Sequence, residues 1–216
     1  VFDVNNKNNA EIIFAVHFNK EIVNEGHSYW YDITNLTDES GQAEALVNCF
    51  TPGDTRKEMI TYVKAENKAY LMTKFLDTKN VSFNQVGNDQ ILLRYADVLL
   101  MYAEALNELG YDASEGSIAL KQLNATRTRA GLTKLTAADV PTQESFRKAI
   151  LDERQKEFPY EGHRWFDLVR MGYAKSVLAT QGLNIQDYQL LFPIPQTEIE
   201  KVGDSKILWQ NPGYDK

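Results

Sequence analysis

The stretch QILLRYADVLLMYAEALNEL, residues 90–109, decides the class of fold. Its four charged side chains fall on one narrow stripe at spacings of three and four, which Met101 completes: Arg94, Asp97, Met101, Glu104 and Glu108. Nearly every other residue is apolar, small or Tyr. A helix with so narrow a polar stripe packs against neighbours on more than one side. We therefore predict a buried helix over residues 90–109, followed by Gly110 at the position where a glycine commonly ends a helix.

A second helix is predicted directly after the first. Asp112, with Glu115 three residues later, resembles a capping box at its start. Gly131 marks its end, and Leu132 is placed to fold back on the last turn. The expected inner face consists of Ile118, Ala119, Leu123, Thr126 and Ala130. Two antiparallel helices joined by a tight turn resemble one tetratricopeptide unit, which needs further helices to cover both of its faces.

Further elements flank this hairpin. Towards the C-terminus we expect helices over residues 143–158, 162–171, 173–180 and 196–202, with an extended LLFPIP segment at 190–195. Thr142 is a good N-cap for the first of these helices. Before the hairpin, AEIIFAVHF (10–18) has the β-branched and aromatic pattern of a strand. The predicted class is mainly α, with tetratricopeptide-like helical hairpins, long loops and a few short strands.

The chain is expected to have two functional regions within one domain. Residues 1–88 form a loop-rich, variable ligand-binding region with short strands, because residues 19–88 show no sustained period and contain one small expected helix at 41–50. Residues 89–216 form the helical region. Long loops in an ordered domain often carry function.

Composition excludes several classes of function. The net charge is −7 and the pI is about 5.1, so the basic footprint of a nucleic-acid-binding protein is absent. The single cysteine, Cys49, cannot form an intrachain disulfide. No stretch approaches 18 apolar residues, and the N-terminus lacks the pattern of a signal peptide.

Sequence motifs for metal and cofactor chemistry are also missing. The three histidines, His17, His27 and His163, are far apart, and there is no HExxH motif or pair of cysteines. Neither GxxxxGK nor GxGxxG occurs, and there is no credible Ser/His/Asp set. We predict no structural metal, no cofactor and no catalytic residue, and the sequence leaves open a loosely held Ca²⁺ in an acidic loop.

The stretch FPYEGHRWFDLVRMG (158–172), with the helix before it, is the strongest rival to this view. Its carboxylates, with those of the preceding helix, are Glu153, Glu157, Glu161 and Asp167. Two of them could form the acid/base pair of a glycoside hydrolase. Three arginines lie close to them in the sequence, namely Arg154, Arg164 and Arg170, and buried charges must be paired. We favour the structural interpretation, in which these groups tie helices together.

The candidate ligand site lies in HSYWYDITN, residues 27–35. Its aromatic residues are Tyr29, Trp30 and Tyr31, and its polar residues include His27, Asp32 and Asn35. Flat rings beside amides and carboxylates suit sugars, whose C–H faces are apolar and whose hydroxyl groups need partners. The alternative is that the rings anchor a long loop to the core, and the sequence leaves this choice open.

Six stretches together resemble the SusD/RagB family of nutrient-binding outer-membrane lipoproteins. They are NAEIIFAVHF (9–18), NDQILLRYADVLLMYAEALNELG (88–110), LNATRTRAGL (123–132), ILDERQKEFPYEGHRWFDLVRMG (150–172), LFPIPQTEI (191–199) and QNPGY (210–214). Their order and spacing are similar to those of the family's C-terminal half.

The resemblance implies a non-enzymatic, mainly helical lipoprotein on the extracellular face of the outer membrane. Such a protein binds oligosaccharides, or sometimes peptides, and passes them to a TonB-dependent transporter, a SusC-like barrel. The resemblance also implies that the 158–172 stretch serves the fold. Family members are roughly twice this long and carry a lipid-anchored cysteine in the other half. We therefore expect a fragment or one piece of a cleaved protein, whose membrane contact is made only through an anchor outside this chain.

Two other classes of function stay open. A tetratricopeptide-type scaffold that binds protein or peptide would show a concave groove lined by the helices between residues 91 and 130. A glycoside hydrolase would use Glu153 or Glu157, and its turnover would be abolished by Glu157→Gln.

Overall fold

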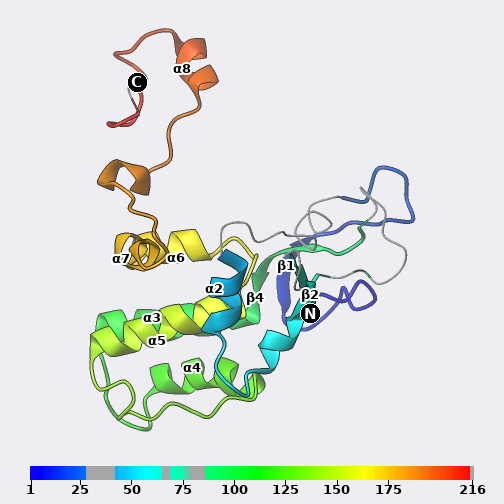
Figure 1. Ribbon diagram of the computed structural model, residues 1–216, viewed down its shortest axis with the longest axis vertical. Coiled ribbons are helices and arrows are strands. Elements are labelled where there is room, and N and C mark those ends of the chain that lie inside the picture. The colour runs from blue at the N-terminus through cyan, green and yellow to red at the C-terminus, as the bar shows by residue number, and fades with distance from the viewer. Residues whose placement is uncertain (28–41, 65–68, 76, 78–85, 215–216) are drawn as a thin grey trace. The chain divides into compact units, whose positions relative to one another are not determined.

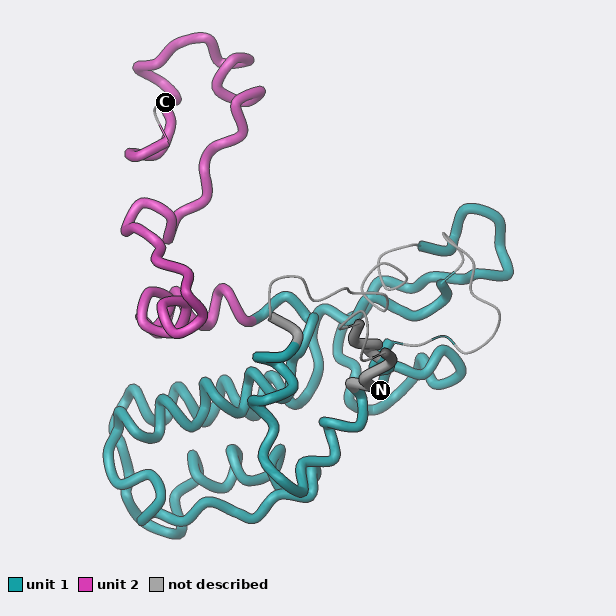
Figure 2. Tube along the Cα trace, viewed as in Figure 1, with its two compact units in different colours: residues 1–163 teal, residues 164–216 magenta. Residues whose placement is uncertain are grey.

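The computed structural model describes residues 1–27, 42–64, 69–75, 77 and 86–214. The chain divides after His163 into two compact units, residues 1–163 and 164–216 (Figure 2). Helices make up most of the described regular structure, and the strands are short (Figure 1). The predicted fold class is confirmed. The division of ligand-binding role at residue 88 stays a prediction.

The predicted helical hairpin is present and consists of α3 (Tyr95–Leu109) and α4 (Ile118–Arg129) (Figure 1). The predicted start of the second helix is wrong. Ser117 is the N-cap, and its hydroxyl accepts a 3.1 Å bond from the N–H of Leu120. Asp112 instead accepts a bond from the N–H of Ser114 within the connecting turn, so the capping-box pattern marks that turn and not the helix.

The C-terminal end of α4 agrees with the prediction. Gly131 has a φ of 80°, the left-handed conformation that favours glycine. The N–H of Leu132 donates to the carbonyl of Arg127 over 2.9 Å, and the Leu132 side chain is buried against the end of the helix. On the predicted inner face Ala119, Leu123, Thr126 and Ala130 are buried, whereas Ile118 is 52% exposed.

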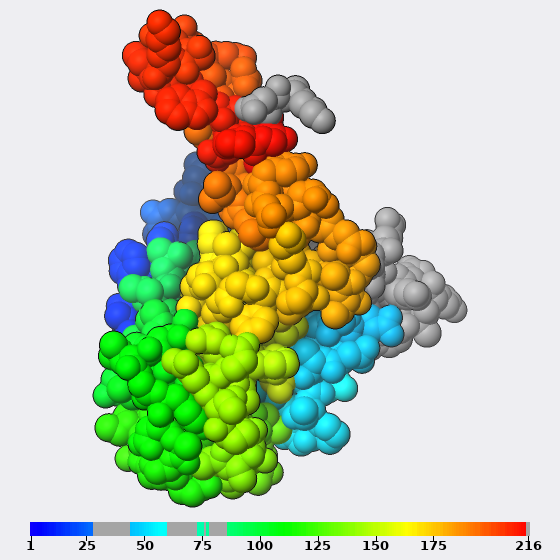
Figure 3. All heavy atoms as spheres, turned by 90° about the vertical axis from the view of Figure 1, so that its left-hand side faces the viewer, coloured from blue at the N-terminus to red at the C-terminus, as the bar shows by residue number. Residues whose placement is uncertain are grey.

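Helix α5 (Gln143–Glu157) packs against both members of the hairpin. Thr142 caps it, as predicted: its hydroxyl accepts a bond from the N–H of Ser145, and the Ser145 hydroxyl accepts one from the N–H of Thr142. In the space-filling view the green atoms of the hairpin lie directly beside the yellow-green atoms of α5 (Figure 3). The core of this layer includes Leu100, Ala103, Leu120, Leu123, Phe146, Ile150 and Leu151.

Residues Gln90–Arg94 form a strand, β4, and the prediction that the helix begins at residue 90 is wrong for this segment. The strand pairs antiparallel with β1 (Ile12–Val16), which lies within the predicted strand at 10–18. Register shifts disturb the alternation, so that Ile91 and Arg94 are buried while Leu92 and Leu93 are exposed. Pairing with β1 satisfies the backbone of β4, and the extended conformation of Arg94 places its side chain in a buried cluster of charges described below.

The other elements are short. The first unit also contains α2 (Gln42–Cys49), the 3₁₀ turn η1 (Thr55–Met59), and the antiparallel pair β2 (Ile60–Lys64) and β3 (Ala69–Met72). The second unit contains α6 (Arg164–Arg170), α7 (Ala174–Ala179), η2 (Asp187–Leu190) and α8 (Gln196–Val202). The predicted small helix at 41–50 and the helix at 196–202 are confirmed.

Two glycines allow a controlled test of the packing at the end of α4. Gly131 and Gly162 have similar φ values, 80° and 84°. A Cβ on Gly131 would lie 3.1 Å from the carbonyl oxygen of Gly53, whereas a Cβ on Gly162 would meet nothing within 4 Å. We expect Gly162→Ala to lower the free energy of unfolding by about 1 kcal/mol through backbone strain. Gly131→Ala should lower it by clearly more in urea denaturation, and equal losses would argue against close packing at Gly53.

Candidate functional site

The predicted ligand-binding residues begin at His27, which lies among the described residues. Five others lie outside the described residues: Tyr29, Trp30, Tyr31, Asp32 and Asn35. The structure therefore describes the base from which this stretch departs. Residues 17–27 and 86–89 form that base together with the N-terminal residues 1–7.

His27 is held on both its backbone and its ring. It forms an antiparallel bridge with Val86, with N–H to carbonyl distances of 3.2 and 3.1 Å. Its Nε2 lies 2.8 Å from the carbonyl oxygen of Asn88, and its ring packs on Phe18 with a centroid distance of 4.4 Å. A carbonyl only accepts, so Nε2 carries the proton. Burial is the main cause that lowers the pKa of His27, which favours the neutral ring at pH 7.

The carboxylate of Asp89 bonds to residues from the other segments of the base. Its Oδ1 accepts from Lys7 Nζ at 2.7 Å and from the N–H of Phe18 at 3.1 Å, and its Oδ2 lies 2.6 Å from His17 Nδ1. Burial acts to raise the pKa of Asp89, but the bonds from Lys7, the Phe18 N–H and His17 outweigh it and hold that pKa below its usual value. The carboxylate therefore stays ionised and fixes three segments of the chain.

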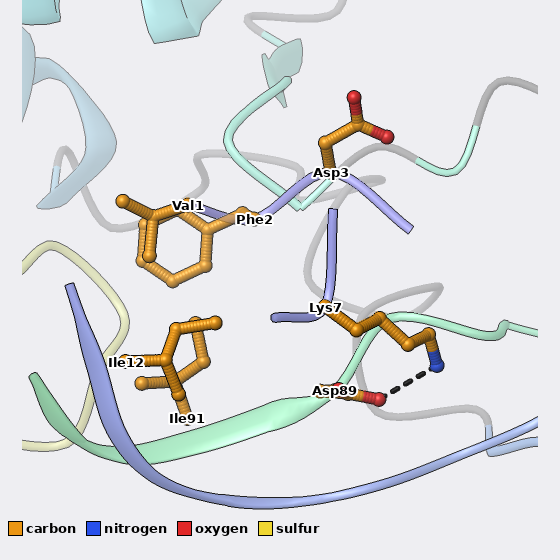
Figure 4. Close-up of a pocket in the computed structure, with 7 residues that line it drawn as sticks. All are labelled: Val1, Phe2, Asp3, Lys7, Ile12, Asp89 and Ile91. Atoms are coloured by element: carbon orange, nitrogen blue, oxygen red, sulfur yellow. Dashed lines mark hydrogen bonds and ion pairs between the residues drawn. The ribbon is translucent and has the colours of Figure 1, made fainter. Parts of the chain in front are cut away.

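A small cavity adjoins this carboxylate, and seven residues line it: Val1, Phe2, Asp3, Lys7, Ile12, Asp89 and Ile91 (Figure 4). Its free volume of about 10 Å³ is close to the space that one water molecule needs. The cavity is too small for a sugar ring. It belongs to the packing of the N-terminal residues against β4.

A second ion pair ties Lys20 to Asp77. The Lys20 ammonium lies 2.7 Å from each carboxylate oxygen of Asp77, and Asp77 also accepts a 3.3 Å bond from the N–H of Gly87. Asp77 is buried. Together with the Asp89 contacts, this pair holds residues 20 and 27 close to the 86–89 segment, so the 28–41 segment leaves from a defined position.

The charged groups of the described base are used to hold the chain in position. Its carboxylates and ammonium groups are bonded to other parts of the chain. Within the described ranges there is no group of three or more His, Cys, Asp or Glu side chains that could hold a metal ion. The prediction that residues 29–35 contact a ligand falls outside the described residues and stays a prediction.

A second group of polar side chains, which we call the Glu157 cluster, lies at the C-terminal ends of α4 and α5. Its acids are Glu11, Asp54, Glu153, Glu157 and Glu161, and its bases are Arg56, Lys74, Arg94, Arg127 and Arg129. The cluster joins η1, β4, α4 and α5 to Glu11, which precedes β1, and to Lys74, which follows β3. Most of its members are buried, so each charge needs a partner and hydrogen bonds.

Glu157 is the centre of this cluster. Its Oε1 accepts from Arg94 Nη1 at 2.6 Å and also from Arg129, while its Oε2 accepts from Arg56 Nη1 at 2.9 Å. Burial acts to raise the pKa of Glu157, but the charges of Arg94 and Arg129 prevail and lower it to about 2.

Lys74 closes the cluster on the side of the N-terminal residues. Its ammonium is 3.1 Å from the carbonyl oxygen of Glu157, bonds to Glu161, and lies 4.8 Å from the centroid of the Phe2 ring. Burial lowers the pKa of Lys74 to about 8, against the opposing effect of Glu161. The ammonium is still mostly protonated at pH 7.

This geometry does not suit acid/base catalysis. A general acid needs a raised pKa and access to the substrate, whereas Glu157 has a lowered pKa and is buried. The Glu153 side chain is fully buried, with its oxygens 2.7 Å from Arg56 and 3.4 Å from Arg127. Both carboxylates are paired with bases, as the structural interpretation predicts.

The partners that the sequence predicts for these carboxylates are mostly wrong. Arg154 pairs with Asp97 at 2.7 Å, and the arginines around Glu153 and Glu157 come from η1, β4 and α4. Asp167 does pair with Arg170, at 2.7 Å within α6. Proximity in sequence identified the acids but not the bases that neutralise them.

No helix in the described part of the chain is long and apolar enough to cross a membrane.

Comparison with known proteins identifies relatives of this chain. The model of the SusD family matches residues 56–214. SusD-like protein P2 of Formosa agariphila is 36% identical over 140 residues, which are 59% of this chain and 26% of that protein. The starch-binding protein SusD of Bacteroides thetaiotaomicron is 31% identical over 147 residues, which are 64% of this chain and 24% of that protein.

A solved structure agrees with these matches. A laminarin-binding SusD-like protein superposes with a TM-score of 0.67 at 27% identity, over 98% of this chain and 51% of that chain. The aligned stretch is about a quarter of each curated relative, and the chain spans about half of the solved structure.

Proposed function

Because the chain belongs to the SusD family, we propose that it is part of a non-catalytic protein that binds oligosaccharides at the cell surface. The observation that carries this proposal is the family match, supported by relatives named as starch-binding and laminarin-binding. The Glu157 cluster supports the non-catalytic role, because its carboxylates are neutralised by buried bases.

We place the ligand on the 27–35 stretch. Tyr29, Trp30 and Tyr31 would stack on sugar rings, with Asp32 and Asn35 as hydrogen-bonding partners. The sequence also predicts His27 as a polar partner of the ligand. Its bond to Asn88 and its packing on Phe18 support a role in positioning the stretch at its base.

Replacing Trp30 by Ala is expected to weaken binding of oligosaccharides at least tenfold, which corresponds to about 1.4 kcal/mol of lost stacking. Isothermal titration calorimetry with laminarin-derived and starch-derived oligosaccharides would measure it, after a glycan array has shown which of them binds. Trp209→Ala is the matched control, since Trp209 is a 63% exposed tryptophan in the second unit. Unchanged affinity in Trp30→Ala would remove this ring from the site.

The partner and location follow from the family and are proposals as well. The protein would sit on the extracellular face of the outer membrane, held by a lipid anchor, and deliver its ligand to a TonB-dependent, SusC-like barrel. Affinity purification of the tagged protein from detergent-solubilised outer membranes tests this. Recovery of a TonB-dependent barrel supports the proposal, and recovery of the protein alone argues against a stable complex.

A further inference from the structure

The described base of the 27–35 stretch exposes acidic side chains and covers its lysines. Asp3, Glu21 and Glu25 are exposed to solvent. The side chains of Lys7 and Lys20 are only 29% and 16% exposed, and each forms an ion pair with a buried carboxylate. A ligand that approaches the base therefore meets more negative than positive charge.

The ammonium group of Lys7 is fully used within the chain. It bonds to the carbonyl oxygen of Phe18, and it lies 2.7 Å from both the carbonyl oxygen of Gly87 and Oδ1 of Asp89. Figure 4 shows this ammonium turned towards Asp89. An ammonium has three N–H donors, so three acceptors take up its whole capacity. Lys7 can bind an anionic ligand only by giving up one of these bonds.

The other basic side chains of the described base are also bonded within the chain. Lys20 forms its ion pair with Asp77, whose side chain is fully buried. His17 donates from Nδ1 to Asp89, and it does so in both protonation states because an ionised carboxylate only accepts. His27 donates to a carbonyl oxygen, and burial lowers its pKa. Each of these groups therefore already has an acceptor of its own.

The sequence between this base and α2 adds further negative charge. Residues 28–41 contain three carboxylates, Asp32, Asp38 and Glu39, and no Lys, Arg or His. Proteins bind carboxylate and sulfate groups mainly through Arg and Lys, which supply both the opposite charge and the hydrogen-bond donors. This stretch supplies neither of these residues.

We propose that the ligand is an oligosaccharide without carboxylate or sulfate groups. The proposal rests on the proposed function, because it names the chemical class of the ligand bound at the same site. An anionic sugar would bring its charge close to exposed carboxylates, and like charges at an interface select against a partner. A hydroxyl group carries no charge and can donate to a carboxylate, so a neutral sugar suits the same surroundings.

Three forms of one oligosaccharide test the proposal with the protein expressed from its complete gene. A glycan array with neutral, uronate and sulfated glycans first identifies the tightest ligand, which should be neutral. Oxidation of its primary hydroxyl groups gives a carboxylate form, and methyl esterification of that form removes the charge again. In calorimetric titrations the carboxylate form should bind about tenfold more weakly than the parent, or weaker still, and the ester should recover most of the affinity.

Three results would overturn the proposal: an anionic glycan as the tightest ligand, a carboxylate form that binds as tightly as its parent, or an ester as weak as the carboxylate form. The last result would show that the loss comes from shape and not from charge. A protein that binds no oligosaccharide on the array would refute the proposed function as well. Failure of the ligand class alone is thus distinguishable from failure of glycan binding.

A pair of double variants tests whether the acids of the base cause the discrimination. Glu21→Gln with Glu25→Gln should narrow the gap in affinity between the parent and carboxylate forms by about threefold. Glu198→Gln with Glu200→Gln is the matched control, because it changes the net charge equally at two exposed positions on α8. Equal effects of the two double variants, or an unchanged gap in the first, would overturn the role of the base.

Discussion

Replacing Arg94 by Met is expected to lower the free energy of unfolding by about 3–5 kcal/mol, because it leaves buried carboxylates without their main partner. All five N–H donors of the guanidinium are used, which is the full capacity of the group. The acceptors are the carboxylates of Glu11, Glu157 and Glu161 and the carbonyl oxygen of Glu157, at 2.6 to 2.8 Å. The Cζ atom of Arg94 also lies 4.4 Å from the centroid of the Phe158 ring.

For a chain of this size the loss corresponds to about 6–20 °C in melting temperature, measurable by circular dichroism. Arg147→Met is the matched control, since Arg147 makes a bidentate contact with Glu108 at 2.8 and 2.7 Å on the surface. Surface pairs contribute about 0–1 kcal/mol. Arg94→Lys should fall between the two, because an ammonium keeps the charge but not the planar fork. If Arg94→Met costs no more than Arg147→Met, the Glu157 cluster is not held by Arg94.

The helices could be predicted because their signals are local. The C-terminal end of α4 and the start of α5 are determined by residues within a few positions, namely Gly131 with Leu132 and Thr142 with Ser145. Such patterns can be recognised in a single sequence because the interactions that they require are formed within one or two turns of the helix.

The narrow polar stripe of residues 90–109 predicted correctly that α3 has more than one neighbouring helix, namely α4 and α5. The predicted burial is wrong in detail, because Asp97 of the stripe is buried while Tyr102 and Leu109 are exposed.

The start of α3 was missed because the competing interaction is not local. Residues 90–94 continue the helical pattern, yet they pair with β1, which lies more than seventy residues earlier in the sequence. Tertiary contacts of this kind override intrinsic propensity. The same reason explains the wrong partners of Glu153 and Glu157: Arg56 is 97 and 101 residues away from them. Sequence proximity carries no information about pairs at that separation.

For the candidate site, the sequence predicts which aromatic and polar residues take part but not how the fold positions them. His27 is the part that the structure describes, and its contacts with Val86 and Asn88 come from a segment about sixty residues later. Asp89, which fixes Lys7, His17 and Phe18, gave no signal in the sequence, since a single Asp before a strand has many possible roles. Its importance is visible only once the fold brings those segments together.

The Glu157 cluster should also determine how the protein responds to acid. The folded state holds the pKa of Glu157 at about 2, below its ordinary value of 4.5. A carboxylate with a lowered pKa binds its proton more weakly in the folded state than in the unfolded state, so it stabilises the fold fully above pH 4.5. That contribution is lost as the pH falls from about 4.5 to about 2, and it amounts to at most about 3 kcal/mol.

Glu157→Gln isolates this contribution, because glutamine keeps the shape of the side chain and does not titrate. At pH 6 the variant should be less stable than the parent, since the cations of Arg94 and Arg129 lose their counter-charge. Urea unfolding at several pH values should show the gap between the two proteins shrinking by up to about 3 kcal/mol as the pH falls towards 2. Since both proteins share every other carboxyl group, the change in the gap reports Glu157 and the bases that face it. A gap that stays constant with pH would mean that Glu157 is not held ionised by these arginines, and that the cluster acts through packing alone.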